Sequence, residues 1–142
     1  MIVVNMYDCR TEGNNKITNN FKVREFKSKD SNIVCVSKEL VDCLQKIRDK
    51  VGKQVIITSA YRTESHNKKV GGASKSKHLY GMAADIYVPG MEALKFARLI
   101  ESIFPNRYGI IAYTKKAFVH FDVRDSAYRG IDDGTLRNVN KF

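Results

Sequence analysis

The chain has 142 residues, 43% of them hydrophobic, and its 25 lysines and arginines outnumber its 15 aspartates and glutamates, for a formal net charge of +10. This length predicts a single domain over residues 1–142, and no apolar run approaches the roughly 20 residues of a bilayer-spanning helix, so we expect no membrane insertion. The positive charge favours a polyanionic partner. Composition alone leaves nucleic acid, an acidic membrane and an anionic cell wall open.

The first segment of the chain contains neither a basic leader nor a long apolar region, so we see no secretory signal and expect synthesis in the cytoplasm. Residues 1–7 are compatible with an edge strand, and residues 11–20 with a polar loop. Cys9, Cys35 and Cys43 are odd in number and lack C-x-x-C spacing, which predicts free thiols rather than disulfides or a cysteine zinc site.

The clearest helix of the sequence begins after Ser37, a residue type that caps helices, and ends at Gly52. Residues 54–60, QVIITSA, are rich in β-branched side chains and predict a buried strand. Apolar residues at three- and four-residue steps form the core face of this helix: Val36, Leu40, Val41, Leu44, Ile47 and Val51.

The remaining elements alternate between helix and strand. Residues 61–70 predict a turn and a short helix capped by Thr63, residues 82–88 predict a strand, and residues 91–104 predict a helix with one apolar side. The polar tail after Arg129 predicts loose packing.

Two β runs near the end of the chain, residues 108–113 and 118–123, have the spacing of a hairpin. Hairpin-type strands next to separate helices are typical of the α+β class. We therefore expect a small antiparallel sheet with helices packed on it.

The strongest chemical signal lies in the stretch SKHLYGMAAD, residues 76–85, and in FVHFDVR, residues 118–124. His78 and Asp85 are seven residues apart, a spacing suited to a loop that runs into a strand, and His120 lies in an apolar run typical of a buried strand. Two imidazoles and one carboxylate are a ligand set that a catalytic zinc uses while a fourth position stays open for water. Each residue taken singly is more often a surface or structural group.

A family resemblance adds weight to this set. The stretch at residues 76–85 reproduces the pattern S-x-H-x-x-G-x-A-x-D and so resembles the D-alanyl-D-alanine carboxypeptidase family of zinc peptidases. That family includes phage endolysins and vancomycin-resistance dipeptidases and shares its fold with the Hedgehog signalling domain. The likeness extends to S-A-Y-R-T at residues 59–63, H-N at 66–67, V-G-G-A at 70–73 and the run at 118–124, and it covers residues 21–124.

The resemblance implies a Hedgehog/DD-peptidase-like fold and a zinc ion bound by His78, Asp85 and His120. It also implies a substrate that contains D-amino acids, typically in peptidoglycan. Arg62 resembles the arginine of the family's S-x-Y-R motif, and we expect it to act in catalysis by stabilising the oxyanion.

The general base is the point at which the chain departs from the family pattern. Many relatives have a Glu or Asp three residues before the last histidine, where this chain has Ala117. Residues two apart on a strand share a face, so we choose Asp122 as the catalytic base. The alternative is that Asp122 orients a ligand histidine or pairs with Arg124, and that another carboxylate or a histidine is the base.

Three further residues are candidates for substrate binding. Arg124 has the chemistry to bind a terminal carboxylate of a stem peptide, and Ser76 and Tyr113 are expected at the cleft. His66 lies in the predicted short helix, where we expect packing or a hydrogen bond rather than metal ligation.

The resulting hypothesis is a zinc-dependent peptidase that hydrolyses peptidoglycan stem peptides or cross-links, as a D,D-carboxypeptidase or an endopeptidase of the phage-lysin type. We expect a monomer that acts on the cell wall, to which anionic wall polymers attract it. The alternative is a non-catalytic, Hedgehog-like metal-binding module that recognises cell wall or a protein partner. We expect no nucleic-acid partner, because the lysines are scattered and no recognition motif is present.

Overall fold

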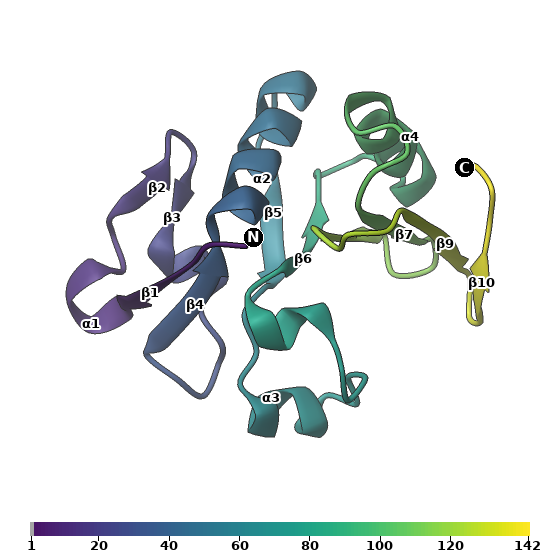
Figure 1. Ribbon diagram of the computed structural model, residues 1–142. Coiled ribbons are helices and arrows are strands. Elements are labelled where there is room, and N and C mark those ends of the chain that lie inside the picture. Colours follow the sequence, from purple (N-terminus) through teal and green to yellow (C-terminus); the bar gives the residue numbers. More distant parts are fainter. Residues whose placement is uncertain (1) are drawn as a thin grey trace.

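A six-stranded sheet organises the structure, a computed structural model that describes residues 2–142 (Figure 1). The strand order is β10-β9-β7-β8-β6-β5, and β7 and β9 are the one parallel pair of this sheet, while the other neighbours are antiparallel. Its strands are β5 (Ile56–Ser59), β6 (Ala83–Tyr87), β7 (Gly109–Tyr113), β8 (Phe118–Asp122), β9 (Tyr128–Asp132) and β10 (Leu136–Asn138).

Two small antiparallel pairs precede this sheet in the sequence. β1 (Val4–Asp8) pairs with β4 (Ile33–Ser37), and β2 (Lys16–Thr18) pairs with β3 (Phe21–Lys22). The expected strand at residues 1–7 is therefore present as β1, although Met1 lies outside the described residues. The predicted polar loop at residues 11–20 contains the last two residues of a short helix, α1 (Cys9–Glu12), and the three residues of β2, so that prediction was wrong for five residues.

Helices cover the apolar side of the large sheet and border its polar side. In Figure 1, α2 and α4 lie side by side above β6, and α3 lies below it. The helices are α1 (Cys9–Glu12), α2 (Lys38–Val51), α3 (Glu64–Lys69) and α4 (Ala93–Ile103), with two short 3-10 helices, η1 (Val23–Phe26) and η2 (Lys77–Tyr80).

Helix α2 confirms the longest helix prediction. The Ser37 hydroxyl accepts a hydrogen bond from the backbone N–H of Leu40 at 3.3 Å, and Gly52 ends the helix with a left-handed φ of 71°. Val36 belongs to β4 rather than to the helix, but it is buried all the same. Leu40, Val41, Leu44 and Ile47 are buried, and each such side chain contributes roughly 1.5–3 kcal/mol to folding.

The two faces of the large sheet differ in chemistry because side chains alternate along each strand. On β6 and β8, the fully buried residues Ala84, Ile86, Val119 and Phe121 face the core, where α4 packs on β7 and β8. Asp85, between Ala84 and Ile86, faces the other way. The sheet thus separates a packed core from a polar surface.

The end of the chain is more ordered than its polarity predicts. β9 contains the buried residues Arg129, Gly130 and Ile131 and pairs with β7, so the prediction of loose packing after Arg129 was wrong for this strand. Parallel pairing between distant strands leaves no local pattern in the sequence, which explains the error. β10, in contrast, is exposed along its whole length.

The helices and the mainly antiparallel sheet confirm the predicted α+β class. Cys9, Cys35 and Cys43 are free thiols, as expected. Among residues 2–142, no helix combines the length and the apolar composition that crossing a membrane requires.

Arg129 provides a test of how firmly β9 is anchored. It is 6% exposed, its Nε and Nη2 donate to the Glu101 carboxylate at 2.9 and 2.7 Å, and its guanidinium also donates to the carbonyl oxygens of Phe104, Arg107 and Tyr108. Arg129→Met leaves these acceptors unsatisfied, so we expect it to lower the free energy of unfolding by about 3 kcal/mol and Tm by roughly 10 °C.

The matched control is Arg137→Met, which removes an exposed ion pair with Asp133 in the same hairpin. We expect thermal unfolding to show little change for this variant, because solvent screens the pair. Equal Tm values for the two variants would contradict the anchoring role of Arg129.

Candidate metal centre

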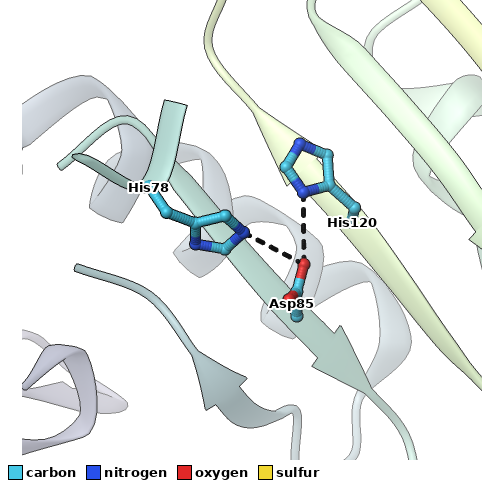
Figure 2. A group of neighbouring side chains, drawn as sticks. All are labelled: His78, Asp85 and His120. Atoms are coloured by element: carbon cyan, nitrogen blue, oxygen red, sulfur yellow. Dashed lines mark hydrogen bonds and ion pairs between the residues drawn. The ribbon is translucent and has the colours of Figure 1, made fainter. Parts of the chain in front are cut away.

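Three side chains from separate segments meet on the polar face of the sheet, as Figure 2 shows. Asp85 Oδ1 lies 3.3 Å from His78 Nε2 and 3.2 Å from His120 Nδ1. One ligand atom from each residue lies within 4.8 Å of the other two. The structure therefore brings together the three residues that the sequence nominated as metal ligands.

Strand register explains how Asp85 and His120 come together. The two residues are direct partners in the antiparallel β6–β8 ladder, on the same face of the sheet. A shift of one residue in this register would turn one of the two side chains to the opposite face. The buried apolar residues on that opposite face oppose such a shift, so the core protects the site.

His78 is positioned by the 3-10 helix η2. The Ser76 hydroxyl accepts a hydrogen bond from the His78 backbone N–H at 3.3 Å, and Gly81 closes the helix with a φ of 69°. Gly81 also passes so close to the chain that a Cβ there would lie 2.4 Å from the Cys35 carbonyl oxygen. His78 Nδ1 lies 2.6 Å from the carbonyl oxygen of Ala60, which can only accept, so Nδ1 carries the proton.

His120 is oriented in the same way from the opposite side. Its Nε2 lies 2.7 Å from Oδ2 of Asp122, and a carboxylate there holds a proton on Nε2. In a neutral ring the other nitrogen, Nδ1, then carries a lone pair that faces Asp85. In their neutral forms, both histidines thus have the tautomer in which the nitrogen near Asp85 can bind a cation.

The charges of the site favour a cation at this point. Burial opposes the charge of Asp85, but hydrogen bonds with His120 and His78 outweigh it and hold the pKa of its carboxyl well below the usual range. Burial also opposes a charged His120, yet the carboxylates of Asp122 and Asp85 raise its pKa to about 9. Two lone pairs that face a carboxylate repel it unless a proton or a metal ion lies between them, and the donor set of two nitrogens and one oxygen fits zinc.

Arg62 borders the metal centre and is held by three contacts. Its Nε donates to Ser59 Oγ at 3.1 Å, its Nη1 to Asn67 Oδ1 at 3.2 Å and its Nη2 to Asp85 Oδ2 at 3.3 Å. The guanidinium therefore lies next to the ligands with a fixed orientation, as expected for a group that stabilises a developing negative charge.

Asn67 is a residue of the site that sequence analysis did not assign. It is 4% exposed, accepts from Arg62, and donates from Nδ2 to the Ala73 carbonyl oxygen at 2.9 Å. It thereby links Arg62 to the loop before η2. The only signal in the sequence was its place in the H-N pair of the resemblance.

Asp122 lies behind His120, away from the solvent. It is fully buried, and besides His120 it accepts from Arg124, whose Nε lies 2.7 Å from Asp122 Oδ1. Gly109 faces this pair across the β7–β8 ladder, where a Cβ would lie 2.6 Å from both carboxylate oxygens. The geometry therefore favours the second of the two roles left open for Asp122, that of a group that orients His120 and pairs with Arg124.

A cleft of about 540 Å³ opens above the candidate ligands. Ser76, Tyr113 and Arg124, the three predicted substrate-binding residues, line it together with the three ligands and Arg62. Tyr113 stacks on Phe118 with ring centroids 4.5 Å apart, and burial raises the pKa of its hydroxyl. His66 lies on α3, outside the ligand cluster.

The ligand assignment predicts how much metal each variant binds. His78→Ala, Asp85→Ala and His120→Ala each remove one of three ligands, so we expect elemental analysis after dialysis to find about one zinc per wild-type chain and far less in each variant. The matched control is His66→Ala, which should keep the wild-type metal content. Equal zinc in all five proteins would contradict the assignment.

Comparison with known proteins agrees with this geometry. Residues 13–122 match the sequence profile of the family described as Peptidase M15, and this segment contains the three candidate ligands. No curated protein sequence matches the chain significantly. Since the match spans well over half of the 142 residues, the chain belongs to the Peptidase M15 family of zinc-dependent peptidases.

Proposed function

We propose that the protein is a zinc peptidase that hydrolyses peptidoglycan stem peptides or cross-links. The observation that carries this proposal is the group of His78, Asp85 and His120 at the base of an open cleft, with the second nitrogen of each ring tied to a hydrogen-bond acceptor. Membership of the Peptidase M15 family supports the same reaction class. Digestion of sacculi distinguishes removal of a terminal residue from cleavage inside a cross-link.

The proposed chemistry divides between the metal and the chain. Zinc bound at such a site supplies a water of lowered pKa and polarises the carbonyl of the cleaved amide. Arg62, at the cleft wall beside Asp85, donates hydrogen bonds to the oxygen on which negative charge develops. Ser59 and Asn67 fix the guanidinium, so that little reorganisation is needed when this charge forms.

Asp122 enters the proposal as a positioning residue. A general base must come within about 3 Å of the water that it deprotonates, or act through one further water. The Asp122 carboxylate contacts His120 and Arg124 instead and does not line the cleft. Its choice as base stays a prediction that the first experiment below separates from the positioning role.

The cell wall is the proposed place of action. An excess of ten positive charges attracts phosphate-bearing wall polymers and raises the encounter rate with the wall. Such attraction weakens with salt, because the Debye length falls to about 8 Å near physiological ionic strength.

One observation favours the alternative, a metal-binding module without catalysis. Among the described residues, Asp85 is the single carboxylate that lines the cleft, and it is already a candidate ligand. A site without a free carboxylate still binds zinc and wall peptides. The second experiment below distinguishes this module from the enzyme.

Asp122→Asn separates the two roles of Asp122. A positioning role predicts that the zinc Kd rises about 10–100-fold and that saturating zinc restores most of kcat. Zinc competition with a fluorescent chelator gives the Kd, and hydrolysis assays over a zinc series give kcat. Asp125→Asn, at an exposed position three residues later, is the control that should change neither value. An unchanged Kd with a kcat that zinc does not restore would identify Asp122 as the base.

Digestion of purified sacculi tests the function itself. We expect wild-type protein to release new amino termini, chelation to stop the release, added zinc to restore it, and Asp85→Ala to abolish it. Mass spectrometry of the fragments then identifies the bond that is cut. Protein that sediments with sacculi in its zinc-loaded form and releases no termini would support the binding module instead.

A further inference from the structure

The cleft above the metal centre is far more positive than the chain as a whole. Five cationic side chains line it against one carboxylate, Asp85, whereas the whole sequence has 25 cationic residues to 15 acidic ones. The ratio of cationic to acidic side chains is therefore higher in the cleft than in the chain as a whole. The five cations are Arg62, Lys75, Lys77, Lys116 and Arg124.

The two arginines and the three lysines differ in what they contact. Arg62 pairs with Asp85, and Arg124 pairs with Asp122. Within residues 2–142, none of the three cleft lysines takes part in an ion pair. Their ammonium groups are thus available to a ligand, whereas both arginines already form ion pairs with aspartates.

The lysines come from two segments of the cleft border. Lys75 lies in the loop before η2, Lys77 is the first residue of η2, and Lys116 lies in the turn between β7 and β8. Because the three ammonium groups lie on flexible side chains around one opening, together they attract anionic groups on a bound ligand.

An apolar part of the lining shows what kind of anion fits. Ile111, Tyr113, Phe118 and Leu136 line the same cleft, and Leu136 is 46% exposed. A polymer of phosphates would leave this apolar surface without a partner. A peptide that combines carboxylates with aliphatic side chains would cover both surfaces.

We propose that Lys75, Lys77 and Lys116 determine specificity by selecting acidic peptides, namely stem peptides with free carboxylates over the same peptides with amidated carboxyl groups. This inference rests on the proposed function, since it names the substrate class of the same cleft. A carboxamide has nearly the shape of a carboxylate but lacks its charge, so the lysines discriminate between the two by electrostatic attraction.

The test compares a stem peptide that has free carboxylates with its amidated counterpart, using full-length, zinc-loaded protein. Exposed ion pairs change affinity by roughly two- to fivefold each, so we expect wild-type protein to prefer the acidic peptide about tenfold, through KM rather than kcat. The triple variant Lys75→Gln, Lys77→Gln, Lys116→Gln should lose this preference and keep kcat. Circular dichroism verifies that it is folded.

Two controls separate local selection from other effects. Lys16→Gln, Lys46→Gln and Lys50→Gln together remove the same net charge at exposed positions outside the cleft and should keep the preference. Leu136→Ala removes an apolar contact without a change in charge and should raise KM for both peptides by the same factor.

Binding measured by fluorescence anisotropy makes the outcome independent of turnover. If the acidic peptide binds preferentially but neither peptide is cut, the proposed function fails and the inference stands. Hydrolysis of both peptides without preference, failure of both to bind, or a preference that survives in the cleft variant would overturn the inference.

Discussion

The carboxylate of Asp85 is the interaction on which the rest of the site depends. One of its oxygens contacts both histidines, and the other accepts from Arg62. A buried carboxylate persists only when such partners compensate its desolvation. Asp85 therefore links His78, His120 and Arg62 through a single carboxylate.

The surroundings keep this carboxylate and its partners in place from three directions. The β6–β8 register sets Asp85 opposite His120, the Ala60 carbonyl oxygen fixes the ring of His78, and Asp122 fixes the ring of His120. Hydrogen bonds of this kind around a metal site orient the ligands and raise their basicity. The close approach of Asp122 to Gly109 adds a steric limit, since a larger residue there would displace the carboxylate.

Sequence analysis identified the groups that follow local rules. His78 and Asp85 were found through their spacing and motif, and α2 through its period, its cap and its terminal glycine. The Ala60 carbonyl oxygen, the burial of Asp122 and the link from Asn67 to Arg62 depend on how distant segments pack, and no local pattern encodes them. For the same reason the parallel strand β9 was missed, although the buried contacts of Arg129 anchor it firmly.

The candidate ligands lie at the base of the cleft, whereas the residues proposed to select the substrate lie at its border. The candidate ligands lie on the paired strands β6 and β8 and in the 3-10 helix η2. All three lie within residues 13–122, the segment that matches the Peptidase M15 profile. Within the same segment, Lys75 lies in a loop, Lys77 begins η2 and Lys116 lies in a turn, whereas Leu136 lies on β10, beyond the segment. Loops and edge strands accept substitution more readily than paired central strands, because fewer buried contacts depend on them. Substrate preference can thus change at the border of the cleft while Asp85 and its histidines keep their geometry.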